Sequence, residues 1–233
     1  SSDVCSSDLA VDIDRECLTA RMQAFCDPGV PDLHVRQLMP KAFVKTPTYD
    51  PARAREAAKT AGFSEQKVVP YLFRPFDVQW TYWDPSIRLM DRPRPEYMQH
   101  VRAGNLWLSA GQHNRKEAFY QPQFTTLAAD LHLVESNVTM FPLFLHGEQD
   151  SQLFDRVNLT PRAQNWLQAA GIADIRAGAE SLFYHILAVL HSPAYREENA
   201  GALRQDWPRI PLPSTREALE ASAGLGRRLA VLL

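Results

Sequence analysis

The stretch Val69-Pro-Tyr-Leu-Phe-Arg-Pro-Phe-Asp-Val-Gln-Trp-Thr-Tyr-Trp-Asp-Pro85 decides the fold class of this chain. Aromatic and β-branched residues crowd it, which is typical of a β-strand. Its side chains alternate from residue 76 on, and we expect one face to point toward a core. That face carries Phe76, Val78, Trp80 and Tyr82. Because Pro75 has no N–H for a strand ladder, we expect the strand to begin after it or to lie at a sheet edge.

An arginine-rich corner follows this strand between Asp84 and Pro95. It carries Arg88, Arg92 and Arg94, and its prolines stiffen the backbone. Guanidinium groups on a stiff loop suit phosphate or base-edge recognition, because each group offers a planar set of donors. The structural alternative is a corner that Arg–Asp pairs tie down, since most ion pairs in folds are structural.

Composition limits the possible functions. The 233 residues carry a formal net charge of −2, with 45% apolar and 22% charged residues. These values are ordinary for a soluble globular protein, and the length allows one large domain or two small ones. Since the molecule is not a polycation, any nucleic-acid surface has to be a local patch.

The cysteines and the N-terminus exclude several protein classes. Cys5, Cys17 and Cys26 are odd in number and show no paired spacing, which argues against a disulfide framework and against a zinc site. No run of 18 apolar residues and no secretory signal occurs, so we expect a cytoplasmic protein without membrane spans. Residues 1–9 resemble translated sequencing adapter, so we expect them to be non-native and the chain to be the tail of a larger protein.

A polar loop from residue 111 to residue 116 lies between two strand-like segments. The first segment is Asn105–Ser109, and the second opens at Phe119. Amide side chains can pair bidentately with adenine, and guanidinium groups with guanine, in a major groove. The candidates for DNA contact in this loop are Gln112, Asn114, Arg115 and Lys116. The alternative interpretation is a solvated turn.

Periodicity divides the chain into a sheet-containing part, residues 70 to 145, and a mainly helical part, residues 158 to 232. In the first part, Met140–Leu145 is an apolar run that predicts an interior or corner strand, with Pro142 at an edge or bulge. In the second part, apolar residues recur at helical spacing. Four large apolar residues are expected to be largely buried: Phe76, Trp80, Phe144 and Leu187.

Capping residues predict a short helix that starts at Pro51. Asp50 is its candidate N-cap, and Gly62 is the stop at its C-terminus. The body of this helix carries basic side chains that could face solvent or phosphates, and we expect the solvated arrangement. These side chains are Arg53, Arg55 and Lys59.

Three further helix starts follow in the last third of the chain. Thr160 precedes a proline and is a candidate N-cap. Ser192, also before a proline, opens a helix that we expect to end near Leu203. The capping box Ser214-Thr-Arg-Glu217 opens the final helix.

Five motifs then point to a known family. They are Tyr71-x-x-Arg-Pro-Phe-Asp77 with Trp80 and Tyr82, Leu89-Met-Asp-Arg-Pro-Arg-Pro-Glu96, Phe141-Pro-Leu-Phe-Leu145, Ala188-Val-Leu-His-Ser-Pro-Ala-Tyr-Arg196 and Trp207-Pro-Arg-Ile-Pro-Leu-Pro213. In this order they resemble the C-terminal specificity region of Type ISP restriction-modification enzymes, from about Tyr49 to Leu233. One departure concerns Gly111-Gln112, where the family pattern often carries Arg-Gln.

The resemblance implies an α+β fold: a mixed, sheet-containing recognition domain with a helical end and double-stranded DNA as its partner. We therefore expect an N-terminal segment at 1–45, a DNA target-recognition part at 46–156 and a helical part at 157–233. The parent protein would carry a nuclease, a helicase-like motor and an N6-adenine methyltransferase, with S-adenosylmethionine, ATP and Mg²⁺ as its cofactors. The methyltransferase domain of the same parent chain would be the second partner.

The sequence lacks the motifs that such catalysis needs. It has no G-x-x-x-x-G-K-S/T loop for ATP, no Asp…Glu-x-Lys nuclease cluster and no Gly-rich turn for S-adenosylmethionine. The nearest match to an amino-methyltransferase motif, Ser192–Tyr195, lacks the second proline and follows a helix instead of a strand. We therefore expect no catalytic residues, cofactor or metal in this stretch itself.

Two hypotheses remain open. The chain is either a DNA target-recognition module or a scaffold that packs against a methyltransferase core without reading bases. An enzyme of another type has little support, because no carboxylate or His/Cys site converges.

Overall fold

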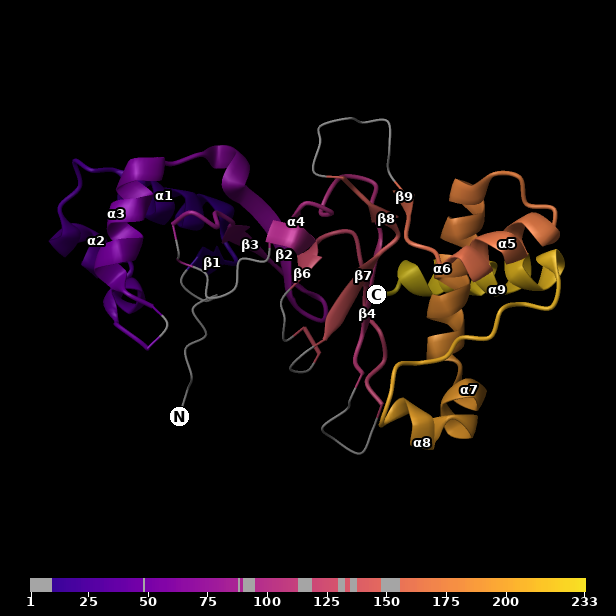
Figure 1. The fold of residues 1–233 in the computed structure, drawn as a ribbon. Coiled ribbons are helices and arrows are strands. Elements are labelled where there is room, and N and C mark those ends of the chain that lie inside the picture. Colours follow the sequence, from indigo (N-terminus) through magenta and orange to yellow (C-terminus); the bar gives the residue numbers. More distant parts are fainter. Residues whose placement is uncertain are drawn as a thin grey trace. The chain divides into compact units, whose positions relative to one another are not determined.

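The computed structural model describes residues 10–47, 49–87, 89, 95–112, 119–129, 133–134, 138–147 and 156–233. Within the chain, the residues cluster into two compact units (Figure 1). The N-terminal unit comprises Ser1–Tyr71 and Asp77–Met98, and the C-terminal unit comprises Leu72–Phe76 and Gln99–Leu233. The expected functional division at residues 46 and 157 stays a prediction.

The N-terminal unit combines short helices with a small sheet. Its helices are α1 (Arg15–Cys26), α2 (Asp32–Leu38), the 3-10 turns η2 (Pro40–Phe43) and η3 (Glu65–Lys67), α3 (Pro51–Ala61) and α4 (Pro95–Met98). Its strands are β1 (Val11–Asp12), β3 (Asp77–Tyr82) and the first part of β2 (Val68–Arg74), up to Tyr71, in that order across the sheet. β1 pairs antiparallel with β3, with Val11 opposite Thr81.

Helix α3 has the boundaries that its sequence predicts. The Asp50 carboxylate accepts hydrogen bonds from the backbone N–H groups of Ala52 and Arg53, so it is the N-cap. Pro51 is the first helical residue. Gly62 ends the helix at a φ of +70°, a conformation that a side chain would disfavour.

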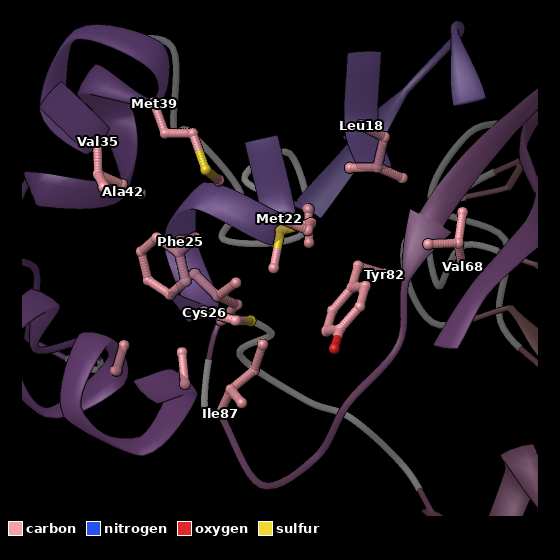
Figure 2. Packing of buried hydrophobic residues seen from close by; sticks show 14 of the residues in the cluster. Leu18, Met22, Phe25, Cys26, Val35, Met39, Ala42, Val68, Tyr82 and Ile87 are labelled. Atoms are coloured by element: carbon pink, nitrogen blue, oxygen red, sulfur yellow. The ribbon is translucent and has the colours of Figure 1, made fainter. Parts of the chain in front are cut away.

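One face of α1 lies in the core of the N-terminal unit. Leu18, Met22 and Phe25 are fully buried, and Tyr82 of β3 lies beside them (Figure 2). The Tyr82 ring stacks on Phe63, with 5.6 Å between the ring centroids. Burial is the main reason why the pKa of Tyr82 rises to about 12. The strand at residues 77 to 82 therefore buries the end that carries Tyr82.

The other end of this strand corrects one prediction and confirms another. Phe76 is 71% exposed and Val78 is 50% exposed, so the face that we expected to be buried lies partly in solvent. Phe76 has a φ of +64° and belongs to the turn between β2 and β3. The alternating strand begins after Pro75, as expected, because β3 starts at Asp77; a further strand, β2, precedes this turn. Proline fits the turn since its fixed φ suits such a position and no N–H is needed there.

Arg55 corrects a second prediction, because its side chain faces neither solvent nor an open surface. It is 1% exposed and reaches the chain that follows α1. Nη2 donates to the carbonyl oxygens of Asp27 at 3.0 Å and Val30 at 2.8 Å, and Nη1 donates to that of Phe25. Nε donates to the Asp32 carboxylate at 3.2 Å. One guanidinium thus donates to three carbonyl groups at the end of α1 and in the chain that follows it.

The C-terminal unit begins with short strands. In its three-stranded sheet, β4 (Trp107–Ala110) lies between β5 (Phe124–Thr125) and β7 (Thr139–Pro142). Both pairings are antiparallel, and Trp107 lies opposite Thr125 on one side and Pro142 on the other. β8 (Phe144–Leu145) pairs with β9 (Arg156–Val157), and β6 is Ala128–Ala129. The predicted strands at 105–109 and 140–145 are confirmed, whereas the strand expected at Phe119 begins at Phe124.

Helices make up the end of this unit. They are α5 (Pro161–Ala169), α6 (Ile175–His191), α7 (Pro193–Glu198), α8 (Ala200–Leu203) and α9 (Arg216–Ala230) (Figure 1). The predicted change from sheet to helix is confirmed. Two details differ: Asn199 separates α7 from α8, and the N-cap of α9 is Thr215, whose hydroxyl accepts the Ala218 N–H at 3.2 Å. Thr215 takes the place that we expected for Ser214.

Helix α6 packs between the sheet and α9. Leu187 is fully buried against Leu108 and Leu143, as predicted, while Phe144 is half-buried. Trp80, in the other unit, is also half-buried. The expected set of four buried residues therefore holds fully only for Leu187.

Gly226 permits the close approach of α9 to α6. A Cβ at this position would lie 1.9 Å from the carbonyl oxygen of Tyr184, which is far inside any real contact. At Gly224, on the same helix, a Cβ would meet nothing within 4 Å.

We predict that Arg55→Ala lowers the free energy of unfolding by about 3 kcal/mol or more, because buried carbonyl groups lose their donor. Urea denaturation measures the change. The matched control is Arg53→Ala on the same helix, where the side chain is exposed and the loss should stay within about 0.5 kcal/mol. Equal losses for both variants would contradict the role given to Arg55.

We predict that Gly226→Ala lowers the free energy of unfolding by about 1–3 kcal/mol, because the added methyl group forces α9 away from α6. Gly224→Ala should instead stabilise it by about 0.5–1 kcal/mol, since alanine suits a helix interior better than glycine. Thermal and urea unfolding of the two variants test this opposite sign. A neutral Gly226→Ala would mean that the helices are not in close contact.

Candidate nucleic-acid interface

Gln112 is the one predicted DNA-contacting residue within the described part of the chain. It follows the end of β4 by two residues and its side chain is exposed. The other six candidates lie outside the described residues, so their positions stay predictions. They are Arg88, Arg92, Arg94, Asn114, Arg115 and Lys116.

The described part of the predicted arginine corner contains Asp84, which is 3% exposed. Lys67 donates to its Oδ2 at 2.5 Å, and the Ser86 N–H and hydroxyl donate to its Oδ1. Burial alone would raise the pKa of Asp84, but these hydrogen bonds outweigh it and hold the pKa below its ordinary value. Lysine and serine thus satisfy this carboxylate.

The side chain of Gln112 is one of the groups that lower the pKa of Asp206, so the two side chains lie near each other. Asp206 comes from a distant part of the sequence, the segment after α8. Its Oδ1 accepts the Trp207 N–H at 2.8 Å, and its Oδ2 lies 3.5 Å from the guanidinium of Arg209. The Trp207 N–H is the main cause that lowers the pKa of Asp206, which is therefore ionised at neutral pH.

Asp206 opens a segment that we call the proline strap, Asp206–Pro213. Side chains of the C-terminal unit hold this strap. The Trp207 ring meets Phe141 of β7 edge to face, with 5.4 Å between centroids. The Tyr195 hydroxyl of α7 donates to the carbonyl oxygen of Arg209 at 3.0 Å. The strap therefore places Asp206 beside the first residues of the candidate loop.

Beneath the strap is an apolar cavity of about 310 Å³. Its walls include Leu108, Phe141, Phe183, Ile186 and Trp207. Such a lining offers no charged group for chemistry.

Sequence reasoning missed Asp206 and Arg209 as part of this site. It recognised the strap as a proline-stiffened segment, but nothing in the local pattern relates residue 206 to residue 112. An acidic side chain is also an unusual choice for a DNA-facing surface, because it repels phosphate. Only the fold brings these side chains together.

The methyltransferase-like sequence at Ser192 has a structural role. It follows α6, and the Ser192 hydroxyl accepts the Tyr195 N–H at 3.5 Å as the N-cap of α7. Among the residues that the structure describes, no three His, Cys, Asp or Glu side chains gather as metal ligands would. None of the described helices has the length and apolar character needed to cross a membrane.

Comparisons with known proteins identify relatives of this fold. The chain is similar to a protein in the cryo-EM structure of a DrdV–DNA complex, with a TM-score of 0.65 and 25% identity over 97% of this chain and 22% of that one. A nuclease-deletion mutant of the Type ISP restriction-modification enzyme LlaGI, in complex with a DNA substrate mimic, matches with a TM-score of 0.61 and 19% identity over 96% of this chain and 20% of that one. The ATP-dependent Type ISP enzyme LlaBIII bound to DNA gives a TM-score of 0.67 and 14% identity over 97% of this chain and 15% of that one.

The chain therefore spans about a fifth or less of the length of these solved relatives. Among curated proteins, no sequence matches it. The family described as the Type ISP C-terminal specificity domain matches residues 6–233, which is nearly the whole chain. This protein belongs to the Type ISP C-terminal specificity domain family.

Proposed function

We propose that this chain recognises the DNA target sequence for a Type ISP restriction-modification enzyme. The match of the specificity-domain family to residues 6–233 carries this proposal. Further support comes from the similar structures of DrdV, LlaGI and LlaBIII, which are described as bound to DNA or to a DNA mimic. The exposed Gln112 adds a side chain whose donor and acceptor suit a base edge.

The candidate residues divide by chemistry. Gln112, Asn114 and Arg115 would contact base edges, because their side chains can form bidentate pairs. Lys116, Arg88, Arg92 and Arg94 would hold phosphates, which position the domain on the duplex without reading its sequence.

The parent enzyme would supply catalysis through its nuclease, helicase-like and N6-adenine methyltransferase parts. Its cofactors would be S-adenosylmethionine, ATP and Mg²⁺. The present chain does not offer the residues for these groups, since its sequence has neither a phosphate-binding loop nor a Gly-rich turn after a strand. We therefore assign all of them to other parts of the parent.

A second function, packing against the methyltransferase domain of the parent, is favoured by an apolar surface at the end of α9. Leu225 is 50% exposed, Val231 is 86% exposed and Leu232 is 74% exposed. Leu225 and Leu232 also line a groove of about 320 Å³ with His191 of α6. This surface is compatible with DNA reading elsewhere on the chain.

We predict that Lys116→Ala weakens binding to all duplex sequences by a similar factor and lowers the slope of log affinity against log salt by about one, because one phosphate contact is lost. Fluorescence anisotropy at several low salt concentrations measures the slope. As a control, Arg216→Ala should leave it unchanged, since Arg216 is paired with Glu220 on α9 at 2.7 Å. An unchanged slope for Lys116→Ala would remove this residue from the interface.

We predict that Gln112→Ala relaxes the preference at one base pair and costs about 1–3 kcal/mol on the preferred site. The measurement is selection from duplexes with randomised bases, followed by sequencing of the bound fraction. If Gln112, Asn114 and Arg115 can all be changed to alanine with the preference intact, this loop does not read DNA. The packing function would then take precedence.

A further inference from the structure

His191, the last residue of α6, reaches a segment that is distant in the sequence. Its Nε2 lies 2.9 Å from the carbonyl oxygen of Pro122. Because a carbonyl oxygen can only accept a hydrogen bond, Nε2 carries the proton and donates. Pro122 is buried, so its carbonyl group depends on a donor within the protein. His191 therefore ties the end of α6 to the chain that leads into β5.

The pairing of β4 with β5 explains why this carbonyl group needs a side chain. Ser109 donates its N–H to the Gln123 carbonyl oxygen at 2.9 Å and accepts the Gln123 N–H on its hydroxyl at 2.7 Å. Antiparallel residue pairs alternate between hydrogen-bonded and non-bonded, so the carbonyl group of the neighbouring Pro122 faces away from β4. A proline suits this position because it has no N–H to leave unpaired, but its carbonyl oxygen still needs a donor. The imidazole of His191 supplies that donor.

Aromatic contacts join the same strand to α6. The ring centroid of Phe124 in β5 lies 6.4 Å from that of Phe183 and 6.0 Å from that of Tyr184. Apolar attraction of this kind holds the two elements together but has little directionality. A hydrogen bond, in contrast, fixes both a distance and a direction. The rings therefore keep β5 on α6, and the bond from His191 sets the position of the chain that enters it.

Gln112 lies on the arm next to this tie. It follows Ala110, the last residue of β4, by two positions, and the register of the strands puts Pro122 opposite Ala110. A shift of Pro122 is passed to the arm of Gln112 through the hydrogen bonds between Ser109 and Gln123. Reading a base edge requires a side chain that its surroundings hold to within about 0.5 Å.

We propose that His191 is a positioning residue for DNA reading, which holds β4 and β5 on α6 so that Gln112 meets its base at a constant place. This inference rests on the proposed DNA-reading function and adds a residue that acts through its hydrogen bond to Pro122. The motif Ala188–Arg196 then contributes two supporting groups in succession, since the next residue, Ser192, is the N-cap of α7.

The test compares His191→Asn with the conservative variant His191→Gln in the full chain. The side-chain nitrogen of glutamine reaches about as far as the imidazole Nε2 and donates in the same way, whereas asparagine is shorter by a CH2 group. Random duplexes are selected and the bound fraction is sequenced. We expect His191→Asn to lower the preference by about fivefold or more at the base pair that Gln112→Ala relaxes, and His191→Gln to retain it. Loss of the preference in both His191 variants would overturn the inference, because the hydrogen bond would not be the cause.

Hydrogen exchange without DNA separates local movement from a general loss of stability. In His191→Asn, the N–H groups of Ser109 and Gln123 should exchange faster by about fivefold or more, while those of α3 keep their rates. In His191→Gln, all of these rates should stay close to those of the unchanged protein. An equal acceleration in α3 would mean that the variant is destabilised as a whole, and the positioning role would be overturned.

The outcomes also separate this inference from the proposed function. If Gln112→Ala relaxes the preference and His191→Asn does not, the positioning role is overturned and base reading by Gln112 stands. If neither variant changes the preference, both fail. If His191→Asn speeds exchange at Ser109 but leaves the preference intact, the hydrogen bond stabilises only the fold, and this result too overturns the inference.

Discussion

The proline strap has to be held by side chains, and the candidate site depends on this constraint. Prolines supply no N–H, so the strap Asp206–Pro213 cannot join a sheet as an ordinary strand. His185 of α6 is one of the side chains that hold the strap. Its Nε2 donates to the Pro211 carbonyl oxygen at 2.9 Å, and its Nδ1 forms a hydrogen bond with the Ser222 hydroxyl of α9 at 2.8 Å. One buried imidazole thereby joins two helices to the strap, and the position of Asp206 near Gln112 depends on where the strap lies.

In both units, a buried polar side chain forms hydrogen bonds with backbone groups of irregular segments. In the N-terminal unit, Arg55 satisfies the carbonyl groups that follow α1. In the C-terminal unit, Asn105 donates to the carbonyl oxygens of His100 and Phe144 and accepts the N–H groups of Leu106 and Phe144. Irregular chain segments cannot satisfy their own backbone, so these side chains replace the missing secondary structure. Their loss should therefore disturb more than one element at once.

The charge of the chain bears on how it would act on DNA. With a net charge of −2, it has little long-range attraction for phosphate, and its basic residues can act only where they cluster. Such a charge balance favours discrimination between sequences over tight binding, in line with the proposed function.

The sequence by itself determined the family, the order of sheet and helix, and the helix boundaries at Pro51 and Thr160. These features follow from local spacing and from capping groups, which act within a few residues. Only the tertiary structure decided that Phe76 is exposed, that Arg55 is buried and that Asp206 lies near Gln112. Alternation shows which side chains share a face, but the extent of the core decides whether that face is covered. Residues 112 and 206 are 94 positions apart, so their proximity leaves no local pattern in the sequence.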